Sequence, residues 1–205
     1  MFKKTPLHEP VDVQRTEVER QLGPLCTRGE GCDQVATGHG PFGSITNPIP
    51  VNGPIGELKY LTKLRGKSGE AVMFHRVGSF GSPVVKHPVD QFEVVCLDAS
   101  QWGLLFFDFY HPRRSNLSPD GYTLVPFNAK LGDLPYGFGS NGVVQDFPQQ
   151  LPNAIRSLFG EHPGAALASV VSERLRKHTF QRPPSRKPAA EKPGKYVLGT
   201  PPSAS

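Results

Sequence analysis

The segment between Gln91 and His111 constrains the fold most, because large apolar residues crowd both sides of a short polar link. The run QFEVVCLD precedes the link ASQW, and GLLFFDFYH follows it. β-Branched and aromatic residues in two such runs favour a β-hairpin. Because both faces are largely apolar, we expect a central hairpin whose second face meets the N-terminal region or another chain. Pairing Asp98 with Gly103 places Phe92, Val94, Cys96, Leu105, Phe107 and Phe109 on one face, and Glu93, Val95, Leu97, Leu104, Phe106, Asp108 and Tyr110 on the other.

Further strands are predicted before and after this hairpin. The runs ELKYLTKLR and EAVMFHRV alternate apolar and polar residues around the link GKSG, which predicts a second hairpin. In that register Tyr60 lies opposite His75. The segment Tyr122–Phe127 is the fifth predicted strand, and Pro126 marks its end or an edge position.

Helical patterns occur near the N-terminus and after the predicted strands. The segment Val11–Leu22 is compatible with a short helix. Pro152 suits the first turn of a helix over 151–161, and a second helix is expected over 165–178. The predicted fold is therefore α+β, with an antiparallel meander of about five strands followed by two short helices, long Pro/Gly-rich loops and disordered termini.

Proline, glycine and charge divide the 205-residue chain into regions. With 22 Pro and 22 Gly, the core is expected to be modest. Residues 166–205 hold eight Lys or Arg and two Glu, a net charge of +6, so the rest of the chain carries −1 of the total +5. We expect a partly ordered segment over 1–40, a single α+β domain over 41–178 and a disordered, basic, Pro-rich tail over 179–205.

The sequence indicates a cytoplasmic protein. The two lysines near the N-terminus are not followed by the apolar stretch of a secretory signal. No run approaches the roughly 20 apolar residues of a membrane span, so no membrane contact is predicted. Three cysteines without a signal do not indicate a disulfide scaffold.

The run LLFFDFYHPRR contains the best candidate site. Asp108 and His111 could act as an acid–base pair, and Arg113 and Arg114 could bind an anion through bidentate donors. Strand alternation puts Asp108 and His111 on opposite faces, so they would meet only if Pro112 turns the chain. The alternative is structural: the arginines form ion pairs with Asp108 or with Glu93 at the rim of the sheet.

Two weaker candidates involve other histidines and cysteines. His75 could support His111, although a histidine on the apolar face of a hairpin is more often a hydrogen-bonded core residue. Cys26, Cys32 and His39 give C-x5-C-x6-H, wider than the usual zinc spacing, so a metal site competes with ordinary thiols. The glycine pattern GFGSNG lacks the flanking strand and helix of a dinucleotide site, and no cofactor is predicted.

Two functions remain open, and whether the protein is an enzyme is open with them. The first is a non-enzymatic binding or assembly module that uses an apolar sheet face or its loops to contact a protein partner or a second copy. The second is a small hydrolase or transferase for an anionic, phosphorylated substrate, with the chemistry at Asp108, His111, Arg113 and Arg114. A weak nucleic-acid contact through the basic tail is a further possibility.

Overall fold

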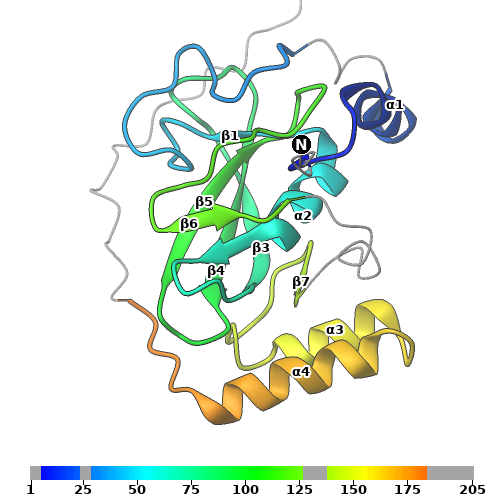
Figure 1. Ribbon diagram of the computed structural model, residues 1–205, viewed down its shortest axis with the longest axis vertical. Coiled ribbons are helices and arrows are strands. Elements are labelled where there is room, and N and C mark those ends of the chain that lie inside the picture. The colour runs from blue at the N-terminus through cyan, green and yellow to red at the C-terminus, as the bar shows by residue number, and fades with distance from the viewer. Residues whose placement is uncertain (1–5, 24–28, 127–137, 184–205) are drawn as a thin grey trace, which may run out of the picture.

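The computed structural model, which describes residues 6–23, 29–126 and 138–183, is built around a five-stranded mixed sheet (Figure 1). The two central pairs are antiparallel, whereas each edge strand runs parallel to its neighbour. In sheet order the strands are β1 (Ile49–Pro50), β5 (Trp102–Asp108), β4 (Val89–Cys96), β3 (Val72–Phe80) and β7 (Phe138–Ser140).

The α+β class is confirmed, but the antiparallel meander was wrong. Both edge strands come from distant parts of the chain: β1 precedes the central strands and β7 follows them after a long connection. A meander needs consecutive hairpins, and parallel pairs need such crossovers instead. β7 includes part of GFGSNG, which therefore serves as an edge strand in this sheet.

The central hairpin of β4 and β5 was predicted with the right faces and the wrong register. Phe92 pairs with Leu105 rather than with Phe109, a shift of four residues. Because side chains alternate with a period of two, an even shift leaves every residue on its predicted face. Phe92 and Phe107 accordingly lie in one apolar cluster, and Val95 lies in the other.

The segment before β3 forms a helix, where a strand had been predicted. Helix α2 (Gly53–Lys63) begins at a glycine with φ of +74° and has Pro54 in its first turn. Leu58 and Leu61 are buried one helical turn apart, whereas Leu58, Tyr60 and Leu64, also buried, fit the alternation of a strand. His75 therefore pairs with Glu93 on β4 and not with Tyr60. The following strand β2 (Leu64–Gly66) pairs with β6 (Tyr122–Leu124) in a separate small sheet.

Helices cover both faces of the main sheet. Helix α2 packs with the cluster that contains Phe74 and Phe107. The hairpin of α3 (Leu151–Phe159) and α4 (Gly164–Lys177) covers Met73, Val95 and Leu97 on the opposite face. These two helices occur close to where they were predicted. Among the described residues, no helix is both long enough and apolar enough to span a bilayer.

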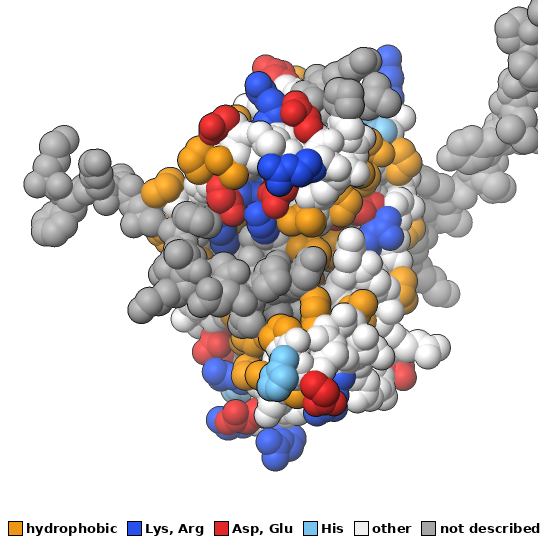
Figure 2. Space-filling view, turned by 90° about the vertical axis from the view of Figure 1, so that its right-hand side faces the viewer, with side chains coloured by type: hydrophobic (Ala, Val, Ile, Leu, Met, Phe, Trp, Pro, Cys, Tyr) orange, Lys and Arg blue, Asp and Glu red, His pale blue; other side chains and the backbone are white. Residues whose placement is uncertain are grey.

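The N-terminal helix α1 (Val11–Leu22) is also confirmed, and it packs against α2. Lys59 of α2 binds Glu17 of α1 at 2.8 Å. Acidic and basic side chains intermingle over this end of the molecule, as Figure 2 shows. Residues 184–205, which hold most of the predicted basic tail, lie outside the described ranges.

Candidate active site

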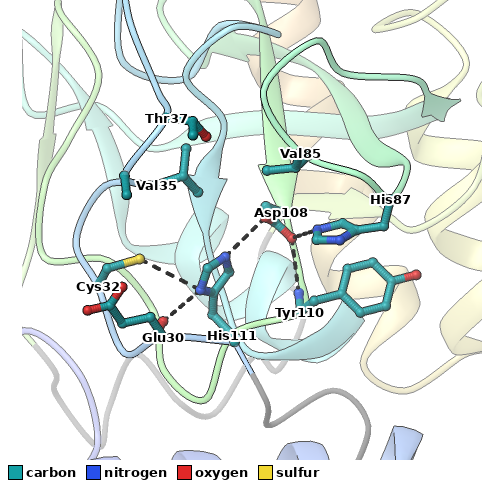
Figure 3. Close-up of a pocket in the computed structure, with 11 residues that line it drawn as sticks. Glu30, Cys32, Val35, Thr37, Val85, His87, Asp108, Tyr110 and His111 are labelled. Atoms are coloured by element: carbon teal, nitrogen blue, oxygen red, sulfur yellow. Dashed lines mark hydrogen bonds and ion pairs between the residues drawn. The ribbon is translucent and has the colours of Figure 1, made fainter.

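A pocket of about 420 Å³ lies where β5 ends beside the start of β4 (Figure 3). Its wall combines one thiol, two imidazoles and two carboxylates with small apolar side chains. The polar members come from three separate segments: the loop after α1, the link before β4, and the end of β5 with the residues that follow. They are Glu30, Cys32, Thr37, His87, Asp108, Tyr110 and His111.

The Asp108 carboxylate lies between two histidines at the pocket. One oxygen is 3.0 Å from Nε2 of His111, and the other is 2.6 Å from Nε2 of His87. The Asp108 side chain is only 1% exposed. Burial alone would raise the pKa of this carboxyl, but the hydrogen bond and charge of His111, with those of His87, hold the pKa below its ordinary value.

Asp108 and His111 meet, which the sequence analysis expected only if the chain turned at Pro112. β5 ends at Asp108, and the chain then leaves the extended conformation. The backbone N–H of His111 donates to the carbonyl of Val51, so the chain bends across the neighbouring segment before Pro112. The bend brings the His111 ring back to the carboxylate.

Both ring nitrogens of His111 face hydrogen-bond acceptors. Nδ1 lies 2.7 Å from the Glu30 carbonyl and 3.7 Å from the Cys32 sulfur, while Nε2 faces Asp108. A carbonyl can only accept, so the imidazolium is the form that satisfies both sides of the ring. Burial alone would lower the pKa of His111, but the hydrogen bonds with Asp108 and Cys32 and the charge of Asp108 raise it to about 10.

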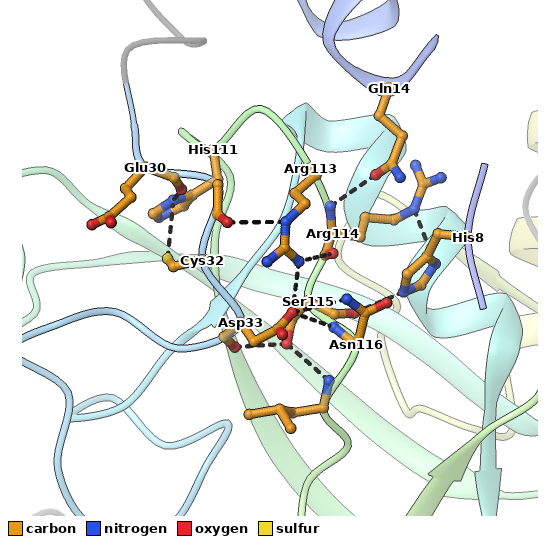
Figure 4. Close-up of polar contacts among 12 residues, drawn as sticks. His8, Gln14, Glu30, Cys32, Asp33, His111, Arg113, Arg114, Ser115 and Asn116 are labelled. Carbon is orange, nitrogen blue, oxygen red and sulfur yellow. Dashed lines mark hydrogen bonds and ion pairs between the residues drawn. The ribbon is translucent and has the colours of Figure 1, made fainter. Parts of the chain in front are cut away.

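Arg113 fixes the loop that carries Cys32 (Figure 4). Its Nη1 binds Asp33 at 2.6 Å, and its Nε donates to the Gly31 carbonyl at 3.0 Å. Asp33 also accepts from the backbone of Asn116 at 2.9 Å. These contacts hold the residues on either side of Cys32, so Arg113 positions the thiol. Arg113 does not line the pocket itself.

Arg114 is a fully buried anchor for the N-terminal segment. Its guanidinium donates to Asn52 at 3.0 Å and to His8 at 3.4 Å, and it forms an ion pair with Glu9. Burial lowers the pKa of Arg114 to about 9. A side chain with no exposed surface and these partners is not available to an anion from solution. The two predicted anion-binding arginines therefore have separate structural contacts.

The other predicted site residues are not brought together. His75 is buried, faces Glu93 at 2.9 Å and does not line the pocket. Its Nδ1 accepts from the backbone of Val144 at 3.1 Å, a core role. His39 is exposed on its loop, and Cys26 lies outside the described residues. Within the described ranges, no three His, Cys, Asp or Glu side chains are placed to hold a metal ion.

His87 is a polar pocket residue that the sequence analysis did not identify. It directly precedes Pro88 and β4. In the observed register of β4 and β5, continuing the pairing beyond Asp90 and Phe107 places His87 opposite Tyr110, and their rings lie 4.2 Å apart. The predicted register was four residues away and set His87 opposite Arg114. Pairing β4 with β5 in the correct register would have identified His87 from the sequence.

Comparison with protein-family models, curated proteins and solved structures gives no match for the chain. Its function is therefore argued from the chemistry of the pocket. A thiol beside an imidazolium, with a carboxylate behind the ring, can support nucleophilic catalysis. The carboxylate fixes the ring, and the cation stabilises negative charge that develops on the sulfur.

Proposed function

We propose that the protein is a small hydrolase or transferase in which Cys32 is the nucleophile and His111 its cationic partner. The observation that carries the proposal is the line of contacts from the Cys32 sulfur through the His111 imidazole to the Asp108 carboxylate. The same constellation of nucleophile, imidazole and orienting acid serves covalent catalysis on unrelated folds.

The reaction is an acyl transfer in two steps. In the first step, the Cys32 thiol gives its proton to solvent, and the sulfur attacks the carbonyl carbon of an activated ester or thioester. An S–C bond forms, and the leaving group departs as an anion with the electrons of the broken bond. In the second step, water or another acceptor attacks the thioester, loses a proton and releases the sulfur. His111 stays an imidazolium and stabilises the sulfur as its negative charge develops.

In this proposal, the residues that line the pocket recognise the substrate. Arg113 and Arg114 are engaged with Asp33 and Glu9, and neither lines the pocket. Support for an anionic substrate is therefore limited to the His111 cation. The small apolar side chains of Val35 and Val85 instead favour a short, uncharged acyl group.

Hydrolysis of p-nitrophenyl acetate by the full chain tests this function. Cys32→Ser is expected to lower kcat/KM by roughly 10³-fold, because the nucleophile is lost. Cys96→Ser is the matched control, since Cys96 is a buried thiol of β4 that does not line the pocket. Equal rates for Cys32→Ser and the unmodified chain would reject the assignment.

A second candidate function, the binding module, is favoured by one surface. Leu104 of β5 lies on the predicted second face of the central hairpin and is 50% exposed. It borders a shallow hollow of about 200 Å³ that Phe42, Pro119 and Tyr122 also line. We propose that this surface meets a second copy of the chain. Light scattering of the chain and of Leu104→Lys tests this interface. A chain that is monomeric, and that keeps its mass and stability when Leu104 is replaced by Lys, would exclude it.

A further inference from the structure

Residues 6–22, which we call the N-terminal strap, are attached to the rest of the fold mainly by polar contacts. In helix α1 of the strap, Gln14 and Val18 are buried, whereas Val11 and Val13 are exposed. Among the described residues, neither apolar cluster of the main sheet includes a residue of the strap. Segments that bury little apolar surface open locally while the core stays folded.

His8 is the residue of the strap whose contacts depend on its protonation (Figure 4). Its Nε2 lies 2.7 Å from the Ser115 carbonyl, and its Nδ1 lies 3.4 Å from Nε of Arg114. A carbonyl only accepts and a guanidinium only donates, so Nε2 carries the hydrogen and Nδ1 keeps its lone pair. The neutral imidazole is therefore the form that satisfies both partners.

The charged and titratable groups that face His8 come from the loop after β5, from α2 and from the strap itself. They are Arg113, Arg114, Lys63, Tyr60 and Glu9. Three of them are cations, the tyrosine ring stacks on the imidazole at 6.3 Å, and the carboxylate is paired with Arg114. Burial, together with the charges of Arg114 and Lys63, lowers the pKa of His8 to about 3.

We infer that the N-terminal strap is an acid-sensitive switch, in which protonation of His8 releases residues 6–22 from the loop of residues 111–116. A hydrogen on Nδ1 would face the Arg114 donor, and a second cation would lie beside the guanidinium. In the released strap the imidazole is solvated and takes up a proton at its ordinary pKa of 6.5. The attached form does not bind this proton. The ratio of released to attached strap therefore rises about tenfold for each pH unit below 6.5, until the pH reaches about 3.

Release of the strap would remove supports from the loop that carries His111. The backbone N–H of Arg114 donates to Gln14 at 2.8 Å, and its guanidinium pairs with Glu9. Arg114 lies three positions after His111 and directly follows Arg113, which holds the Cys32 loop. Acid should therefore loosen the pocket. This effect on the pocket rests on the proposed function, whereas the release of the strap does not.

Hydrogen–deuterium exchange of the full chain at pH 7.5 and at pH 5.0, corrected for intrinsic exchange rates, tests the inference. The protection factors of the α1 amides are expected to fall roughly 30-fold at pH 5.0, while those of β3 and β4 are retained. Glutamine offers a donor for Ser115 and an acceptor for Arg114 but does not titrate. In His8→Gln the α1 protection should therefore change by less than about threefold.

An exposed histidine far from the strap provides the control. His162→Gln, in the turn between α3 and α4, should keep the full acid-induced loss of α1 protection. Equal losses in His8→Gln and the unmodified chain would overturn the role of His8. Constant α1 protection in the unmodified chain between the two pH values would overturn the release itself. Both results are obtained without substrate, so they are independent of whether Cys32 is acylated.

Discussion

The Asp108 carboxylate accepts a hydrogen bond at 3.0 Å from the imidazole of His111, three positions further along the chain. The two side chains meet because β5 ends at Asp108 and the chain bends before Pro112. The contact orients the ring toward Cys32 and keeps it protonated. Both the stability of the protein and its proposed chemistry therefore depend on this pair.

We expect a stability contribution from His111 that disappears at high pH. Its pKa rises from 6.5 to about 10 on folding, so folding favours the protonated form. This contribution is fully present below about pH 6.5 and is lost as the pH rises through about 10. Urea unfolding should show a decline on the order of 3 kcal/mol over this range that is absent in His111→Gln. Parallel pH profiles for the two proteins would contradict this account.

Arg113→Ala should affect reactivity more than stability. The side chain holds the Cys32 loop through Asp33 and Gly31, so its loss should misplace the thiol and slow p-nitrophenyl acetate hydrolysis roughly tenfold.

Arg114→Ala should instead lower the stability of the fold more than its reactivity. It leaves Glu9 without its buried partner and should cost about 3–5 kcal/mol in urea unfolding. Equal stability losses in the two variants would be inconsistent with these separate roles.

Gly29 should not tolerate a side chain. A Cβ at this position would collide with the carbonyl of Tyr110, which is backbone and cannot move aside easily. Gly29→Ala is expected to displace the loop before Cys32 and reduce hydrolysis. Gly81→Ala is the matched control, because nothing lies within 4 Å of its Cβ and the residue is exposed. An unimpaired Gly29→Ala protein would show that this close approach is dispensable.

Arg182 should stabilise the segment after α4. Its guanidinium binds both oxygens of the buried Glu93 at 2.9 and 2.8 Å, and Glu93 also accepts from His75 and Trp102. Arg182→Ala is expected to lower the free energy of urea unfolding by about 1–3 kcal/mol. Arg176→Ala, an exposed change on the last turn of α4, should cost less than about 0.5 kcal/mol. Indistinguishable losses would exclude a contribution from the Glu93 contact.

The sequence correctly predicted those segments whose hydrophobic pattern is compatible with only one type of secondary structure. The helix over Val11–Leu22 and the two faces of the central hairpin belong to this group. The segment around Leu58 fits both a helix and a strand, so its periodicity could not choose between them. The parallel edge strands are only two or three residues long and depend on tertiary contacts that local patterns do not encode.

The candidate site was found in part for the same reason. Asp108 and His111 stood out as polar groups after an apolar strand, but their contact depends on a backbone bend. The sequence predicted Cys32 only as a metal ligand. Its partner His111 lies 79 positions away, and no local pattern links the two residues. His87 required the register of β4 and β5, which depends on the conformation of the link between them.

Localisation of an acyl group after brief reaction with p-nitrophenyl acetate tests the central claim most directly. The full chain is quenched in acid, digested and sequenced by tandem mass spectrometry, and Cys96→Ser, which changes a thiol that does not line the pocket, is treated in parallel. We expect an acetyl group on Cys32 in both proteins. Turnover of the ester with Cys32 unmodified in both proteins would contradict the assignment of Cys32 as the nucleophile.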